Sequence, residues 1–248
     1  MLSKPNKTLG VLGGMGPAAA AEFLRLLAEG APAASDAEHP RMILLSDPDI
    51  PDRSDGIMGL GPDPLPAIKK DLLQLVEWGA EVLAVPCNTA HFFIDRFREE
   101  LSVPLVHIVE ATVNAARRAS PEGAWLVATS GTQKSLIYPA CAEKAGYLFL
   151  RPSREQQECV QQSLRAVKAG DRRRAAELLR EVVEALWRER DLPIATACTE
   201  LPLAYAAAGL PPDRQISSLQ ALADACLDLL YERGDGAAGW GVGAFVPR

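Results

Sequence analysis

Long hydrophobic runs are missing from this sequence of 248 residues. A helix that spans a membrane needs roughly 18–20 consecutive apolar residues, and no stretch of the chain approaches that length. The opening residues MLSKPNK also lack the apolar centre of a signal peptide. We therefore expect a cytoplasmic protein with no membrane partner.

Basic residues are in the minority, since 26 Lys and Arg stand against 32 Asp and Glu and leave a net charge of −6. Nucleic acids and anionic membranes bind basic surfaces, so this balance predicts no nucleic-acid partner. The basic cluster at residues 172–174 opens a predicted helix that also carries Glu177 and Glu181, which is typical of a solvent-exposed face. An anionic substrate would need its own local positive residues.

Metal-binding and disulfide patterns are also absent. The three histidines are scattered singly and no cysteine pair has CxxC spacing, so we predict no metal site. The five cysteines are odd in number and irregular in spacing, which fits a reducing compartment rather than a disulfide framework. Some of these thiols are therefore candidates for chemistry.

The sequence alternates short apolar runs with longer amphipathic stretches, the pattern of strand–helix units around a parallel sheet. We therefore predict an α/β protein. The expected strands span residues 8–12, 41–45, 81–85, 104–108, 124–128, 147–150 and 192–197. The expected helices include residues 66–78, 89–101, 175–189 and 218–232, and Pro17 opens another.

Two halves of similar design are predicted. The turn VLGGMGP near the start has a counterpart in LVATSGT at mid-chain, and each half then reaches a strand that ends in a cysteine. We expect two related α/β domains that face each other, the first containing residues 1–119 plus 217–248 and the second residues 120–216. The glycine-rich tail from Gly234 onward is expected to be partly disordered.

Cys87 and Cys198 each stand between a predicted strand and a predicted helix, where open α/β sheets bind their ligands. Unpaired N–H groups at a helix start stabilise a thiolate, which predicts a pKa below the usual value of about 8.5 for both thiols. Thr89 and Thr199 beside them are suited to hold a carboxylate. The matched pair predicts thiol chemistry, whereas the remaining cysteines are interpreted as small buried hydrophobes: Cys141, Cys159 and Cys226.

Seven segments follow one another in the order and spacing of a known family: GVLGGMGP (10–17), IPDR (50–53), PCNTAH (86–91), HIVEAT (107–112), ATSGT (128–132), VKAGD (167–171) and CTELPL (198–203). On these the chain resembles the aspartate/glutamate racemases, and in particular the aspartate racemase branch. The resemblance covers nearly the whole chain. It implies two pseudo-symmetric α/β domains, an active site in the cleft between them, and a homodimer.

The resemblance implies that the chain interconverts the L- and D-forms of an acidic amino acid, aspartate first and glutamate second, without PLP or another cofactor. Racemisation removes the proton on Cα and returns it from the opposite face, so two acid/base groups must flank that carbon. Cys87 and Cys198 would be these catalytic groups, one as thiolate and the other as thiol, with roles that exchange with direction. Positioned N–H donors would stabilise the carbanion.

The resemblance also assigns substrate contacts, and Arg53 and Lys168 would hold the side-chain carboxylate. The other substrate-binding residues would be Met15, Asn88, Thr89, Ala90, Thr132, Thr199 and Glu200, with His91 in support.

Ordinary structural roles compete with several of these assignments. Asn88 is also suited to cap a helix, Met15 to fill a core, and Lys168 to complement a helix dipole. Arg53 has Asp49, Asp52 and Asp55 close in sequence for a salt bridge. His91, four residues after Cys87, would either tune the thiol or pack within a helix.

Two departures from the family pattern stand out. Residues 195–197, ATA, replace the bulkier apolar residue and glycine usual before the second cysteine. Asp47 and Asp49 replace Asn and Gln and add negative charge near Arg53, which weakens the expectation of a strictly acidic substrate.

Other functions remain open on the sequence. Partial glycine motifs at residues 14–19 and 131–135 match dinucleotide and phosphate loops poorly, and a PLP racemase would leave the cysteine pair unexplained. Hydantoin racemisation and maleate isomerisation also use paired cysteines, and a broader amino-acid racemase is a further alternative. A non-catalytic amino-acid-binding protein would need neither thiol.

Overall fold

The computed structural model describes residues 5–232. Within them the strands form two four-stranded sheets, and every neighbouring pair of strands is parallel. The strands are β1 (Leu9–Gly13), β2 (Met42–Ser46), β3 (Val82–Ala84), β4 (Leu105–Val106), β5 (Ala124–Ala128), β6 (Phe149–Leu150), β7 (Ile194–Ala197) and β8 (Gln215–Ser217). The α/β class with parallel sheets is therefore confirmed.

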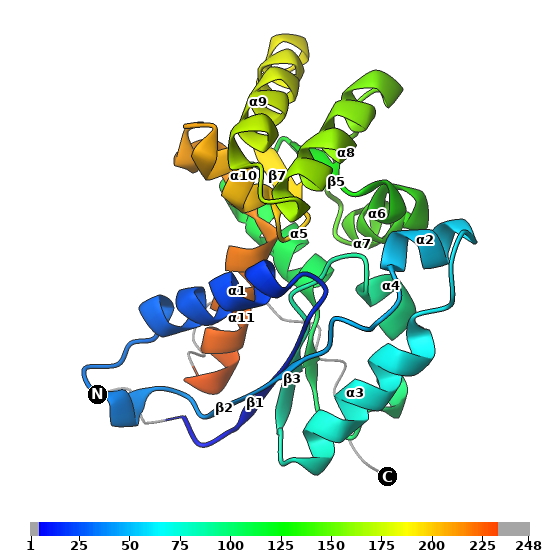
Figure 1. Cartoon of the computed structure of the whole chain (residues 1–248). Helices are drawn as coiled ribbons and strands as arrows, with labels where there is room; N and C mark the ends of the chain where they lie inside the picture. The colour runs from blue at the N-terminus through cyan, green and yellow to red at the C-terminus, as the bar shows by residue number, and fades with distance from the viewer. Residues whose placement is uncertain (1–4, 233–248) are drawn as a thin grey trace.

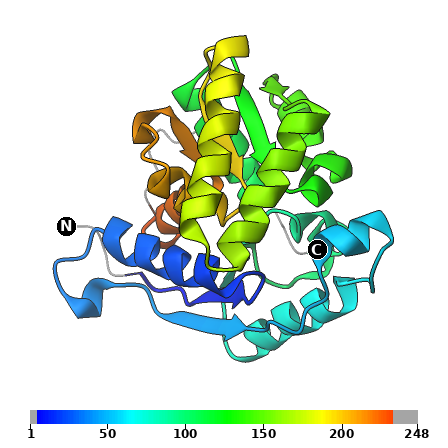
Figure 2. The same ribbon diagram turned by 45° about the horizontal axis from the view of Figure 1, so that its top comes forward.

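Helices connect the strands and cover both faces of each sheet (Figure 1). They are α1 (Pro17–Gly30), α2 (Arg53–Met58), α3 (Leu65–Glu77), α4 (His91–Ile94), α5 (Ile108–Ala119), α6 (Ser130–Ser135), α7 (Ile137–Lys144), α8 (Arg154–Lys168), α9 (Arg172–Glu189), α10 (Leu201–Ala207) and α11 (Ser218–Leu230), with 3₁₀ turns η1 (Asp36–Glu38), η2 (Arg98–Glu100) and η3 (Pro212–Arg214). Figure 2 shows α8 and α9 side by side over the second sheet.

The alternation of side chains along the strands divides most of the interior into three main cores, beside a small alanine cluster between α5 and α11. Leu9 and Val11 of β1 point into a central core that also receives Leu126 and Ala128 of β5. Leu12 points to the opposite face, into a core with α3. Residues two apart in a strand share a face and successive residues lie on opposite faces, as the pleat requires. The central core, filled by α1, α5, α7 and α11, therefore belongs to both sheets.

The two sheets have the same strand order, β2-β1-β3-β4 and β6-β5-β7-β8. In each, the chain leaves the first strand to one side and later returns to its other side, which opens a crevice beyond the carboxyl ends of that strand and its later neighbour. Met15 follows β1 and Cys87 follows β3; Thr129 follows β5 and Cys198 follows β7. The topology thus brings corresponding loops of the two halves together.

Each of the seven predicted strands is present, with ends shifted by two residues or fewer at most positions. β8 was not predicted. The prediction of one helix over residues 89–101 is wrong, because only α4 and η2 form there and the backbone of Phe97 leaves the helical region (φ −143°, ψ 4°). The residues after Cys87 form a turn instead of the start of a long helix.

Arg53 is the first residue of α2, which gives it a defined support. Asp52 caps this helix, since its carboxylate accepts hydrogen bonds from the backbone N–H groups of Ser54 and Asp55. α2 packs against α6 at Gly131, where an added Cβ would lie 2.5 Å from Ser54 Oγ. Glycine at this position therefore permits the close approach of the two halves.

Some predictions are not tested by the fold. The tail from Gly234 onward lies outside the described residues, and the division into domains 1–119 plus 217–248 and 120–216 stays a prediction. Within residues 5–232, no helix has both the length and the apolar character needed to cross a membrane.

The turn after β1 makes a stability prediction. Gly14 has φ +93°, and an added Cβ would lie 2.2 Å from the backbone oxygen of Asp47. Gly59 also has a positive φ, of +73°, but open space around it. We expect Gly59→Ala to lower the free energy of unfolding by about 1–2 kcal/mol and Gly14→Ala to lower it by about 1–3 kcal/mol more. Equal urea midpoints for the two variants would contradict this account.

Candidate active site

A pocket lies where the two halves meet, and both halves supply its lining. The predicted site residues that line it are Met15, Arg53, Cys87, Asn88, Thr89, Lys168, Cys198, Thr199 and Glu200, joined by Asp52, Ser54 and Thr129. Its volume is about 30 Å³, which is small for a ligand site. The structure therefore brings most of the predicted residues together around a narrow pocket.

Cys87 is 6% exposed, and a backbone hydrogen bond from Ala90 reaches its sulfur. Burial raises the pKa of this thiol, while the guanidinium of Arg53 and the Ala90 hydrogen bond oppose the rise. Ala90, predicted as a substrate contact, thus directs its N–H toward the thiol.

Cys198 is 5% exposed and has a different partner. Its Sγ donates a hydrogen bond of 2.9 Å to Oε2 of Glu200. Burial, and then the charge of Glu200, raises the pKa of Cys198 well above its usual value. The predicted lowering of both thiol pKa values is therefore wrong, because loss of water outweighs the nearby N–H groups.

Arg53 and Lys168 place two positive charges at the pocket. Arg53 Nη1 donates to the backbone oxygens of Ile50 and Pro51, each at 3.1 Å, and its buried Nε has no protein partner. Among residues 5–232 no ion pair involves Arg53, so the alternative of a local salt bridge is wrong. Lys168 Nζ lies 3.9 Å from Asp52 Oδ2, with 54% of the lysine side chain exposed.

Part of the negative charge expected near Arg53, that of Asp47, interacts with another acidic side chain. Asp47 interacts with the carboxyl of Asp71 on α3, and burial together with Asp47 raises the pKa of Asp71 to about 6. Oδ2 of Asp71 is buried without a hydrogen-bond partner. Asp47 therefore faces a buried acid instead of serving as a salt-bridge partner of Arg53.

Asn88 joins the two halves through a buried hydrogen-bond network. Its Nδ2 donates to Oγ of Ser218 at 2.9 Å, and Ser218 Oγ donates to the backbone oxygen of Thr196 at 2.9 Å. Tyr138 OH donates to Asn88 Oδ1 and contacts Thr112 Oγ1 at 3.2 Å. Asn88 does not cap α4, whose first residues have no side-chain cap. Its side chain instead ties the Cys87 turn to the strand before Cys198.

A second polar contact crosses between the halves at three threonines. Thr89 Oγ1 lies 2.8 Å from Thr132 Oγ1 and 3.1 Å from Thr129 Oγ1. Thr132 is fully buried, so its hydroxyl serves Thr89 in this structure and does not line the pocket.

His91 is fully buried and contacts the backbone of the Cys87 turn. Its Nδ1 lies 2.9 Å from the backbone oxygen of Cys87, and its Nε2 accepts from the N–H of Ile108 at 3.4 Å. Burial, and then His107, lowers the pKa of His91 to about 3. The ring is therefore neutral near pH 7, and Nδ1–H donates to Cys87. His91 holds the turn and does not contact the thiol's sulfur.

Sequence reasoning missed several residues of the site. Tyr138 and Ser218 gave no signal beyond their places in or next to predicted elements, and Thr112 was noted only within HIVEAT. All five cysteine thiols are free, and within residues 5–232 no three His, Cys, Asp or Glu side chains gather as a metal site would require.

The fold and the pocket define a class: a two-lobed α/β protein whose lobes each direct one thiol into a shared site. Residues 12–226 match the Asp/Glu/Hydantoin racemase family. Because this match spans most of the chain, the protein belongs to that family and is an isomerase.

Three relatives illustrate the likeness. The aspartate racemase of Picrophilus torridus superposes with a TM-score of 0.79 at 27% identity, covering 92% of this chain and 95% of that chain. The broad specificity amino-acid racemase RacX of Bacillus subtilis (strain 168) is 29% identical over 203 residues, which are 78% of this chain and 85% of that protein. The glutamate racemase from Thermus thermophilus, solved with beta-chloro-D-alanine, shares the fold with a TM-score of 0.66 at 21% identity, covering 94% of this chain and 83% of that chain.

Removal of the Tyr138 hydroxyl tests the buried network. Tyr138→Phe leaves the oxygen of Asn88 without its donor, so we expect the free energy of unfolding to fall by about 1–3 kcal/mol. Tyr147→Phe is the matched control, because the Tyr147 hydroxyl is buried without a partner and its loss should be neutral or stabilising. Urea unfolding measures both. A similar loss in the two variants would contradict the network's role.

Proposed function

We propose that this protein is a cofactor-independent racemase of an acidic amino acid, aspartate first and glutamate second, with Cys87 and Cys198 as its two bases. The observation that carries the proposal is that the two cysteines follow corresponding strands, β3 and β7, and line one pocket. Two acid/base groups on opposite sides of a carbon are what racemisation needs.

The reaction starts with one cysteine as thiolate and the other as thiol. The thiolate takes the proton from Cα, and the thiol returns a proton to the opposite face. The carbanion between these steps is stabilised by N–H donors in the turns that follow the two cysteines, at residues 88–90 and 199–200. Exclusion of water from a pocket this small strengthens those interactions.

Arg53 and Lys168 support an acidic substrate. The unpartnered buried Nε of Arg53 is a donor without an acceptor, and a substrate carboxylate would supply one. Lys168 stands at the same pocket and brings a second positive charge.

A broader substrate range is the second candidate. The side chain of Lys168 is more than half exposed and lies near Asp52, so its attraction for a carboxylate is partly cancelled and screened. The relative RacX has broad specificity by name. The homodimer and the cytoplasmic location expected from the sequence stay predictions.

The direct test is a chiral assay of the purified protein in deuterated water without added PLP, with each enantiomer of aspartate and glutamate. We expect the opposite enantiomer to form with deuterium at Cα. Cys87→Ala and Cys198→Ala should each lower the rate at least about 10²-fold, as loss of an acid/base group does. Cys159→Ala is the control and should keep full activity, because Cys159 is half-buried on α8 and does not line the pocket. Substantial turnover in Cys87→Ala or in Cys198→Ala would refute the two-base mechanism.

Substrate preference tests the two cations. Arg53→Gln and Lys168→Gln should each raise KM for aspartate about tenfold or more. KM for a neutral amino acid should rise less, because only aspartate loses a charged contact. Arg173→Gln is the control, since this arginine is 91% exposed and pairs with Glu177. Equal increases in KM for acidic and neutral substrates would show that these two cations do not hold the side-chain carboxylate. Activity on neutral amino acids alone would favour the broader range.

A further inference from the structure

We propose that Glu200 is a catalytic residue that holds Cys198 as the thiol in the resting enzyme, so that Cys87 is the resting base. This inference rests on the proposed two-cysteine function. The assignment of Glu200 as a substrate contact does not account for its geometry, because its carboxylate is already bound to the reacting sulfur of Cys198.

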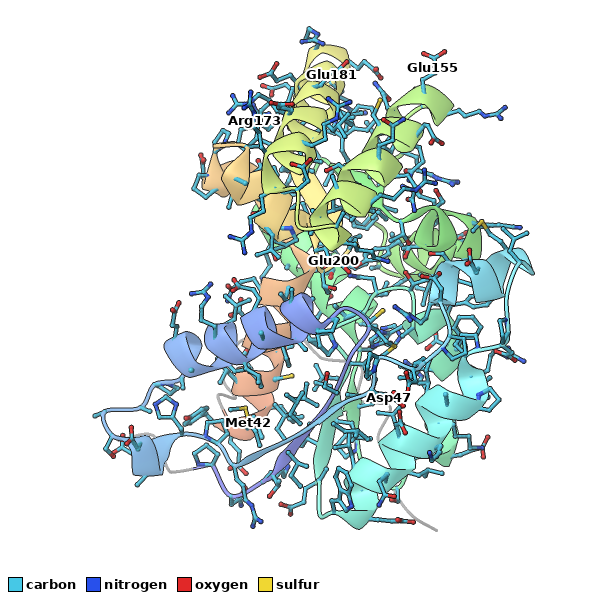
Figure 3. The ribbon with its side chains drawn as sticks, in the orientation of Figure 1. Met42, Asp47, Glu155, Arg173, Glu181 and Glu200 are labelled. Carbon is cyan, nitrogen blue, oxygen red and sulfur yellow. The ribbon has the colours of Figure 1, made fainter. Side chains whose placement is uncertain are left out.

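Glu200 is an unusual neighbour for a thiol that is proposed to transfer a proton. Its side chain is 6% exposed, and Oε2 accepts the hydrogen bond of 2.9 Å from Cys198 Sγ. A carboxylate can accept this bond only while the sulfur keeps its proton, and it repels a thiolate in its place. Figure 3 shows Glu200 at the junction of the two halves, far from Glu181 on α9.

Cys87 has the opposite surroundings. Arg53 and the backbone hydrogen bond from Ala90 favour its thiolate, whereas Glu200 acts on it only through its charge. The other charged groups that line the pocket are Lys168 and Asp52, which are paired with each other at 3.9 Å. These charges make Cys87 the thiol that loses its proton more readily, and Cys198 the one that keeps it.

Gly16 leaves room for the carboxylate of Glu200 beside Cys198. A Cβ at position 16 would lie 2.8 Å from Oε1 of Glu200. The last glycine of the GGMGP turn therefore sets the position of the carboxylate, which gives a second way to disturb the Cys198 contact without changing Glu200.

The protons balance in this scheme. The Cys87 thiolate takes the Cα proton, and the Cys198 thiol gives its proton to the other face, which leaves Cys87 as thiol and Cys198 as thiolate beside Glu200. Solvent exchange then removes a proton from Cys87 and restores one to Cys198. The two enantiomers have equal free energy in water, so kcat/KM must be equal in the two directions. The asymmetry therefore has to be measured on the thiols themselves.

Thiol alkylation measures the difference in ionisation between Cys87 and Cys198 without reference to turnover. The full-length protein is treated with iodoacetamide near neutral pH, and the labelled cysteines are located by peptide mass spectrometry over time. Cys87 and Cys198 are 6% and 5% exposed, so access is similar and the order of labelling reports the thiolate. Half-buried Cys159 is the internal reference for the reagent. We expect Cys87 to be labelled before Cys198.

Glu200→Gln keeps the shape of the side chain and removes its charge. We expect labelling of Cys198, relative to Cys159, to rise about tenfold or more, which corresponds to one pKa unit. Gly16→Ala should also raise the labelling of Cys198, because it displaces the carboxylate of Glu200. This variant remains informative if Glu200→Gln fails to fold. Glu181→Gln is the control, because Glu181 is exposed and remote, and should change nothing.

Two results would overturn the inference: labelling of Cys198 before Cys87 in the native protein, or an unchanged labelling order and rate in folded Glu200→Gln. Failure of the proposed racemase function looks different. In that case the chiral assay is silent with all four acidic amino acids while the labelling pattern still follows the charge of Glu200.

Discussion

The buried bridge from Asn88 through Ser218 to the backbone of Thr196 is the contact on which the site depends. It joins the turn that carries Cys87 to the strand that ends before Cys198, across the central core shared by both sheets. Two acid/base groups that serve opposite faces of one carbon need a fixed separation, and a satisfied polar network in a low dielectric supplies a rigid one. The parallel sheets bring the loops near each other, and the bridge sets their spacing.

On that fixed frame, unlike charges make the two halves chemically unequal. The strand orders are the same, yet one thiol faces an arginine and the other a glutamate. Burial makes both thiols reluctant to ionise, so in the proposed scheme the neighbouring charges decide which of them loses its proton more readily. A duplicated topology can therefore support a reaction whose two steps differ, the removal of a proton and its return.

Much of the fold could be predicted from the sequence, because buried parallel strands are continuous apolar runs bounded by turns. The two cysteines were found because their contexts match at two places in the chain. Tyr138 and Ser218 could not be found, since a buried hydroxyl leaves no local pattern and its partner Asn88 is 50 or 130 residues away. The thiol pKa values were mispredicted for a related reason: local N–H donors can be read from sequence, whereas burial is set by the whole fold.

The small volume of the pocket has a kinetic consequence. The pocket of about 30 Å³ is smaller than an amino acid, so under the proposed function the two halves have to move apart for a substrate to enter and again for the product to leave. In that scheme the carbanion forms between the two halves after they have come together, where the proton that returns comes from a thiol and not from bulk solvent. The rate of the proposed reaction would then depend on this opening as well as on the chemistry.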